Sequence, residues 1–186
     1  MMRALGALLA VAFVSTAVPA LAAEPVAYPR AAGSIVIRFT ETIGELQPGE
    51  PGPSLTVYGD GRAVAHYPGF MKRAGDHTTQ LSAAELDGIM QSIAAKGLLA
   101  FDAAAVQRAR DGASAARRAG NAPVTVWSEV DVTTIEVTVA EGTRRVTWRG
   151  VREDARQFPE VAALQNLAAL RAELGAIMDR AYTQGR

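Results

Sequence analysis

Hydrophobic and polar residues alternate with a period of two in three stretches of the chain. The first stretch begins with Ile35, Ile37 and Phe39 at every second position, and the others cover residues 54–67 and 124–149. A strand places successive side chains on opposite faces, so this pattern indicates half-buried strands. We predict a first strand followed by two β regions.

The second stretch predicts a β-hairpin, because Asp60-Gly61 can supply the positive φ angles of a two-residue turn. In that register Val64 lies opposite Val57, and both share one face of the hairpin. His66 lies at the end of the same face.

The third stretch predicts another hairpin, with Glu141-Gly142 as its two-residue turn. In that register Ile135 lies opposite Trp148, and every large apolar residue falls on one face. The other face carries Glu136, Thr138, Arg145, Thr147 and Arg149. Such a face is typical of an antiparallel sheet with one solvated side.

The segment after the first hairpin predicts a helix. Ser82 and Glu85 form a capping box that can satisfy the free amides at a helix start. Apolar residues follow at helical spacing, and Lys96-Gly97 closes the helix with a cation and a residue suited to the left-handed cap.

Two further segments have helical character. A last helix is predicted to start at Pro159, with an apolar stripe that can cover the sheet. Residues 102–120 are rich in Ala and Arg, and Val106 is their only sizeable aliphatic residue. This segment is either a surface helix or a mobile excursion, because it has little to bury.

Together these elements predict an α+β fold. Its antiparallel sheet is built from the first strand and the two hairpin regions, and helices that include the C-terminal one cover one face. Residues 34–182 are expected to form a single domain. Residues 44–53, rich in Gly and Pro, predict a loop.

Residues 1–22 have the pattern of a secretory signal peptide. Arg3 precedes an apolar run that is too short to span a bilayer, and the run ends in a small-x-small cleavage pattern. We expect a bacterial protein that is periplasmic or secreted, with a flexible leader over residues 23–33. No integral membrane segment is expected after signal removal.

Charge and composition narrow the function. The 19 Lys and Arg residues balance the 19 Asp and Glu residues, so the basic surplus that favours nucleic-acid binding is missing. The chain contains no Cys, so an exported domain must be stabilised by packing without disulfides. No phosphate-binding loop or nucleophile motif occurs, and we expect neither a cofactor nor a catalytic residue.

The two histidines define one candidate polar site. His66 ends a strand face, and His77 lies in a predicted polar loop beside Asp76. A shared metal site would need a further ligand such as Asp60, and no tight ligand spacing is present. A hydrogen-bonded structural role is the commoner outcome for such histidines, so we expect no metal.

The densest charge feature is a basic group formed by Arg144, Arg145, Arg149, Arg152 and Arg156. It is interpreted either as a solvated sheet edge that resists strand addition or as a patch for an anionic ligand or the envelope surface. Glu129 and Asp131 would project to the same side of a continuous strand. They could form a carboxylate pair, although exposed acids at a strand entrance are commoner.

Between residues 54 and 179 the chain carries a series of short motifs. They are Tyr58-Gly59-Asp60-Gly61 after a strand, Ser82-Ala83-Ala84-Glu85-Leu86 at a helix start and the Gly-Leu-Leu-x-Phe exit at 97–101. Followed by a strand near Asp131 and a C-terminal helix, this order resembles an uncharacterised family of exported bacterial proteins. Members often carry Cys-Pro where this chain has Gly52-Pro53. The resemblance implies a fold pattern and no activity.

These observations favour a non-enzymatic binding or accessory domain of the bacterial envelope or medium. Its partner would be an unknown exported protein or envelope component, bound on the exposed sheet face or the 44–53 loop. The alternative is a metal-dependent or hydrolase-like envelope enzyme using His66, His77 and an acidic residue. A third possibility is an inhibitor that presents the Pro-rich loop to another exported protein.

Overall fold

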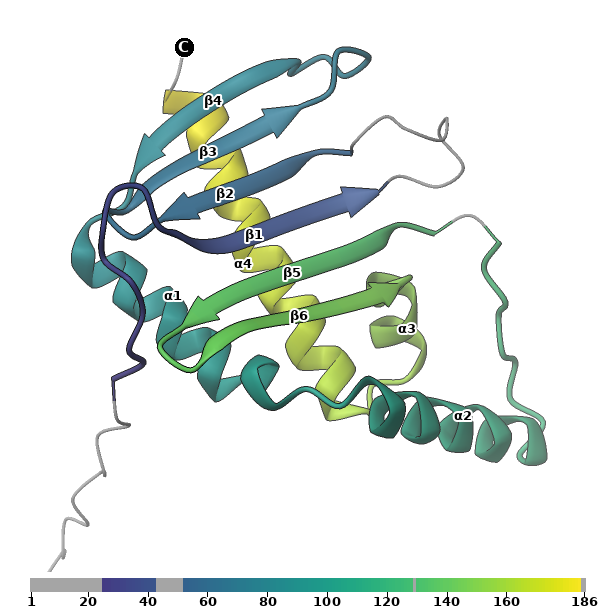
Figure 1. Ribbon diagram of the computed structural model, residues 1–186. Helices are drawn as coiled ribbons and strands as arrows, with labels where there is room; N and C mark the ends of the chain where they lie inside the picture. The colour runs from purple at the N-terminus through teal and green to yellow at the C-terminus, as the bar shows by residue number, and fades with distance from the viewer. Residues whose placement is uncertain (1–24, 43–51, 129, 185–186) are drawn as a thin grey trace, which may run out of the picture.

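The computed structural model describes residues 25–42, 52–128 and 130–184. Within these ranges the chain forms one six-stranded antiparallel sheet in the order β4-β3-β2-β1-β5-β6 (Figure 1). The strands are β1 (Ile35–Thr42), β2 (Ser54–Tyr58), β3 (Arg62–Tyr67), β4 (Gly75–Gln80), β5 (Val132–Val139) and β6 (Gly142–Arg149). The helices are α1 (Ala83–Ala95), the 3-10 turn η1 (Leu98–Ala100), α2 (Ala103–Ala119), α3 (Val151–Gln157) and α4 (Ala162–Gln184). The predicted α+β fold is therefore confirmed.

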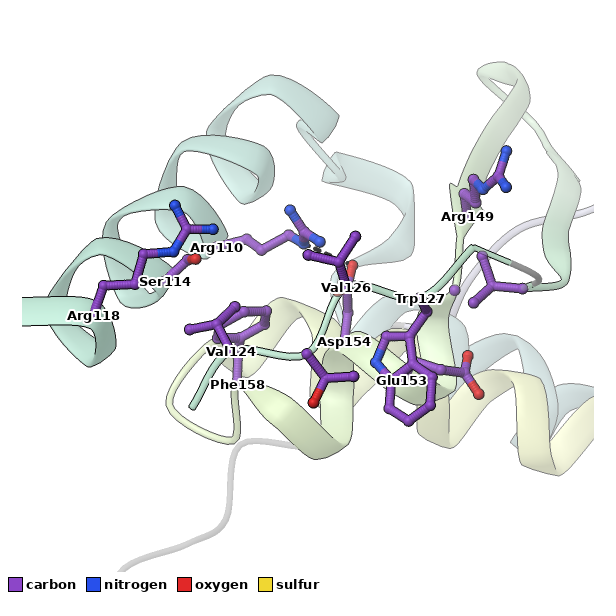
Figure 2. A pocket seen from close by; sticks show the side chains of 13 residues that line it. Arg110, Ser114, Arg118, Val124, Val126, Trp127, Arg149, Glu153, Asp154 and Phe158 are labelled. Atoms are coloured by element: carbon purple, nitrogen blue, oxygen red, sulfur yellow. Dashed lines mark hydrogen bonds and ion pairs between the residues drawn. The ribbon is translucent and has the colours of Figure 1, made fainter. Parts of the chain in front are cut away.

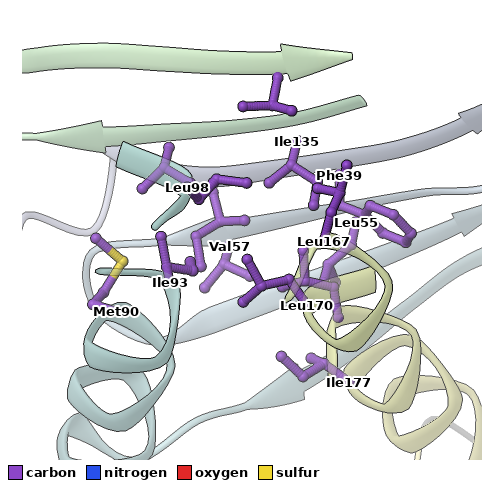
Figure 3. Close-up of a cluster of buried hydrophobic side chains, with 14 of the residues drawn as sticks. Phe39, Leu55, Val57, Met90, Ile93, Leu98, Ile135, Leu167, Leu170 and Ile177 are labelled. Carbon is purple, nitrogen blue, oxygen red and sulfur yellow. The ribbon is translucent and has the colours of Figure 1, made fainter. Parts of the chain in front are cut away.

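The hydrophobic core lies between the sheet and the helices on one of its faces. The long helix α4 runs across the strands, and α1 packs on the same side (Figure 1). Phe39, Leu55 and Ile135 of the sheet meet Leu167 and Leu170 of α4, and each is at most 2% exposed (Figure 3). Burying such a side chain contributes roughly 1.5–3 kcal/mol, so this layer stabilises the fold while the opposite sheet face stays open.

Helix α1 has the two ends that the sequence predicts. The Ser82 amide donates to Glu85 Oε2 at 2.7 Å, and the Glu85 amide donates to Ser82 Oγ at 3.2 Å. At the other end Lys96 is the C-cap and Gly97 has a φ of 76°. The capping box and the left-handed glycine are both confirmed.

The first hairpin differs from its predicted register by one residue. Its loop has three residues, and only Gly61 has a positive φ, 87°, as in a type I turn followed by a left-handed residue. Val57 therefore pairs with Ala63, and Val64 pairs with Thr56. Because a one-residue slip reverses every side chain, Val64 and His66 lie on the open face of the sheet. The prediction that Val64 shares the face of Val57 is wrong.

The second hairpin keeps its predicted faces in a different register. Its two-residue turn is Ala140-Glu141, one position earlier than expected, and Ile135 pairs with Val146. The pairing has moved by two positions, and an even shift leaves each side chain on its original face. Trp148 accordingly stays on the helix-covered face, 7% exposed.

Two short elements have no counterpart in the predicted pattern. Strand β4 forms one edge of the sheet where a polar loop is predicted. Only Thr79 of this strand is buried, so its sequence lacks the alternating hydrophobic pattern of a half-buried strand. Helix α3 follows Gly150, which has a φ of 69°.

The last helix begins at Ala162 and not at Pro159, since the connection from α3 is fixed by Phe158, which is fully buried.

Part of the predicted leader packs against the domain. Tyr28 is buried, and its hydroxyl donates to Asp87 of α1 at 2.6 Å. The carbonyl of Ala27 accepts the Ala140 amide at 2.9 Å. The segment from residue 25 onward is thus held by α1 and by the β5–β6 turn. The predicted signal peptide at 1–22 and most of the 44–53 loop lie outside the described residues.

Residues 102–120 contain helix α2, so the surface-helix alternative is confirmed. Asp102 caps its start, accepting the Ala105 amide at 3.0 Å, and Asn121 follows its end with a φ of 56°. All 17 helical residues are described, and only Val106 and Ser114 are buried. The helix lies at the β6 side of the molecule beside α3, where it forms one wall of the site described below (Figure 1).

Candidate functional site

The two histidines do not form a common site. His66 lies on the open sheet face, where its Nδ1 is 2.6 Å from Asp76 Oδ1 of β4. His77 lies on the other face and packs edge-on against Tyr182 of α4, with ring centroids 5.0 Å apart. Asp60 sits in the β2–β3 turn at the opposite end of β3 and accepts a backbone amide. No group of three or more metal-ligating side chains occurs among the described residues.

The predicted basic group is divided between elements and mostly neutralised. Arg145 pairs with Glu136 on the open sheet face, and Arg144 projects to the opposite face of the same strand. On α3, Arg152 lies 2.6 Å from Asp131, and Arg156 lies 3.1 Å from Glu153. Three of the five arginines of this group are therefore paired with acids. The predicted pair of Asp131 with residue 129 is untested, because residue 129 is outside the described part.

Arg149, the remaining member of the group, lines a cavity of about 220 Å³ (Figure 2). We call this cavity the α2–α3 cleft. Its walls come from α2, from residues 124–127 with Val130, and from the chain between the end of β6 and Phe158. Arg110, Ser114 and Arg118 line it from α2, because their spacing puts them on one side of the helix.

A buried carboxylate joins the walls of the cleft. The Asp154 side chain is 8% exposed, and its Oδ2 accepts hydrogen bonds from Arg110 Nε and Trp148 Nε1, both at 2.9 Å. The Arg110 guanidinium also lies 5.5 Å from the ring centroid of Phe158. One acidic side chain therefore fixes α2 against both α3 and β6.

The segment 124–128 is fastened at two points. Gln157 of α3 accepts the Thr125 amide at 2.8 Å and donates to the Thr125 carbonyl at 3.1 Å. Arg149 donates to the Ser128 carbonyl at 2.7 Å. Between these contacts Val126 is 83% exposed and Trp127 is 48% exposed. A fixed backbone thus holds two large apolar side chains at the rim of the cleft.

Among the described residues, the charged side chains that line the cleft are three arginines (Arg110, Arg118 and Arg149) and two acids (Glu153 and Asp154). Asp154 is neutralised by Arg110, and Glu153 is neutralised by Arg156. Within the described part of the chain neither Arg118 nor Arg149 has a carboxylate partner. Two guanidinium groups without acidic partners, beside exposed apolar side chains, can bind an anion through charge-assisted hydrogen bonds.

Sequence reasoning found Arg149 and missed the rest of the cleft. The spacing of Arg110, Ser114 and Arg118 was available as a signal, because side chains four positions apart lie on the same side of a helix. Nothing in the sequence indicated that Asp154 would bind both Arg110 and Trp148.

Comparison with known proteins adds no neighbour: no family model, curated protein or solved structure matches the chain. Among the described helices none combines the length and apolar character required to cross a bilayer.

Proposed function

We propose that this protein is an exported, non-enzymatic binding domain that holds an anionic ligand in the α2–α3 cleft. The observation that carries the proposal is the pair Arg118 and Arg149, which line one cavity without carboxylate partners among the described residues. Arg guanidinium groups bind carboxylates and phosphates with geometry that lysine cannot reproduce. The ligand therefore carries at least one such group.

A binding role is favoured over catalysis by the state of the acidic side chains. Asp154 accepts two hydrogen bonds on one oxygen, and Glu153 is paired with Arg156. Carboxylates held in this way position other groups and are poorly placed to exchange protons with a ligand. The enzyme alternative that uses His66 and His77 lacks support, because the two rings lie on opposite faces of the sheet.

Export is proposed from the pattern of residues 1–22, and a bacterial envelope or medium is the corresponding location. The resemblance to exported bacterial proteins of unknown function is consistent with that location and remains a prediction. A small exported domain with a fixed cleft suits the capture or sensing of a small anion.

The proposal is tested by titrating the ¹⁵N-labelled protein with inorganic phosphate and following amide chemical shifts. We expect saturable shifts at residues 114–118 and 149–154, and an affinity about tenfold weaker in Arg118→Gln, which is ~1.4 kcal/mol. Arg144→Gln is the matched control, because it removes the same charge from an exposed side chain that does not line the cleft. Shifts that are absent, or that change equally in both variants, would contradict the proposal.

A further inference from the structure

Helix α2 places three polar side chains in a row along the α2–α3 cleft. Arg110, Ser114 and Arg118 follow one another at intervals of four residues, and all three line the cavity (Figure 2). Side chains at that spacing have Cβ atoms about 5–6 Å apart, so neighbouring members of the row can contact the same small ion.

Ser114 is the central member of this row, and its hydroxyl is unpaired. The residue is 9% exposed, and the hydroxyl makes no hydrogen bond to any described residue. A buried hydroxyl is stabilised by a hydrogen-bond partner, which an anion beside Arg110 or Arg118 would supply. Ser114 therefore marks a place for the anion within the cleft.

Asp154 adds an acceptor directly beside the row. Its Oδ2 accepts a hydrogen bond from Arg110 Nε at 2.9 Å, as the dashed line in Figure 2 marks. Its Oδ1 accepts no hydrogen bond within the described ranges, although the side chain lines the cavity and is 8% exposed. Because Arg110 contacts Asp154, an anion bound at Arg110 and Ser114 lies next to a carboxylate oxygen that can only accept.

Resting on the proposed function, we infer that the anion held in the cleft is one that itself donates a hydrogen bond, hydrogen phosphate in preference to sulfate. A carboxylate repels a fully ionised anion, whereas a P–OH group donates to it in a short charge-assisted hydrogen bond. Inorganic phosphate keeps at least one proton at neutral pH, and sulfate keeps none. The arginines and Ser114 thus attract an oxyanion, and Asp154 selects one that is protonated.

The inference is tested by the same amide-shift titration of the protein, with four tetrahedral oxyanions at pH 7. Phosphate and arsenate carry a proton, while sulfate and selenate carry none. We expect phosphate and arsenate to bind at least about tenfold more tightly, because a site that receives a hydrogen-bond donor rejects an analogue without one. Equal affinity for phosphate and sulfate would overturn the inference.

Asp154→Asn isolates the selecting group. Asparagine keeps the size of the side chain and an oxygen for Arg110 and Trp148, but its amide nitrogen can donate to sulfate. We expect the ratio of phosphate affinity to sulfate affinity to fall to about one. Both ions are measured in the same variant, so a general loss of affinity cancels. An unchanged ratio would overturn the inference, and the four-ion comparison in the parent protein decides it if the variant does not fold.

Two further variants separate selection from attraction. Asp111→Asn removes an acid 3.4 Å from the same Arg110, but Asp111 is 61% exposed and does not line the cleft. The ratio should stay unchanged in this control, and a fall equal to that in Asp154→Asn would overturn the inference. Ser114→Ala should weaken phosphate and sulfate alike, by about fivefold. Unchanged affinities in Ser114→Ala would place the anion away from the row and overturn the inference.

The outcomes separate this inference from the proposed function. If all four ions shift the cleft amides with equal affinity, the cleft binds anions and the selection by Asp154 is wrong. If none of the four perturbs the cleft, the proposed function itself is wrong, and the inference fails with it.

Discussion

Arg110 and Asp154 lie 44 residues apart in the chain, and Arg110 Nε donates to Asp154 Oδ2 at 2.9 Å. The same oxygen accepts the indole N–H of Trp148. Helix α2 buries only two of its residues, so this polar junction replaces the apolar contacts that attach most helices to a domain. The walls of the α2–α3 cleft depend on it.

Asp154→Ala should lower the free energy of unfolding by about 2–3 kcal/mol, because it leaves the Trp148 N–H buried without an acceptor and the Arg110 charge without a partner. Urea denaturation followed by circular dichroism measures the change. Asp111→Asn is the control, since Asp111 lies 3.4 Å from the same Arg110 but is 61% exposed. That variant should lose less than about 0.5 kcal/mol. Equal losses in the two variants would show that Asp154 does not fasten α2.

Gly61 is required by the three-residue turn between β2 and β3. It has a φ of 87°, and an added Cβ would lie 2.2 Å from the Leu81 carbonyl oxygen. Gly61→Ala should therefore cost at least about 1–2 kcal/mol. Gly88→Ala in the exposed part of α1 meets nothing within 4 Å and should instead stabilise the protein by about 0.5–1 kcal/mol. Thermal unfolding of the two variants measures both effects, and a tolerated Gly61→Ala would refute this turn geometry.

Tyr28→Phe tests the packing of the segment that begins at residue 25. Burial, followed by the hydrogen bond to Asp87, raises the pKa of the Tyr28 phenol to about 12. The folded state favours the neutral phenol. The contribution of Tyr28 to the free energy of unfolding is therefore complete below pH ~10 and is lost as the pH rises toward 12. At pH 7 the variant should lose about 1 kcal/mol, and the difference should shrink above pH ~10.

The control for Tyr28 is Tyr58→Phe, because the Tyr58 hydroxyl makes no hydrogen bond within the described residues. It should change the free energy of unfolding by less than about 0.5 kcal/mol at pH 7. If Tyr28→Phe behaves like Tyr58→Phe, the segment is a free leader.

Glu85 couples the start of α1 to the end of α4 in a pH-dependent way. Hydrogen bonds from Arg180, and then from Ser82, lower the pKa of the Glu85 carboxyl from 4.5 to about 2. A depressed folded-state pKa stabilises the protein above pH ~4.5, and the stabilisation is lost as the pH falls toward 2. Glu85→Gln should therefore be less stable than the parent protein at pH 7 and equally stable near pH 2.

Denaturant unfolding at both pH values measures this difference for Glu85→Gln. Glu141→Gln is the control, because the Glu141 side chain has no partner among the described residues. It should match the parent protein at pH 7. A Glu85→Gln penalty that persists at pH 2 would contradict the role of the charged carboxylate.

The sequence predicts the fold well where a residue pattern is compatible with only one local structure. The capping box of Ser82 and Glu85 and the alternation in β1 and β5 are of this kind. The register of the first hairpin is harder to predict, because Gly59 and Gly61 both flank Asp60 and permit a loop of either two or three residues. Strand β4 was hidden since an edge strand with one buried residue lacks a hydrophobic pattern.

The candidate site was less predictable because its parts are distant in the chain. Arg118, Trp127, Arg149 and Asp154 meet only after α2 has folded against α3. Charge density along the chain pointed to residues 144–156, where most cations prove to be neutralised by acids such as Asp131. What distinguishes Arg118 and Arg149 is that neither pairs with a carboxylate among the described residues, and that property appears only in three dimensions.

The most direct test of the anion-binding cleft is a crystal structure of the protein grown with inorganic phosphate. We predict one phosphate in the cleft, with an oxygen within about 2.7–2.9 Å of a guanidinium nitrogen of Arg118 or Arg149. A cleft that excludes the ligand at saturating concentration, or a ligand that occupies a different surface, would contradict the account.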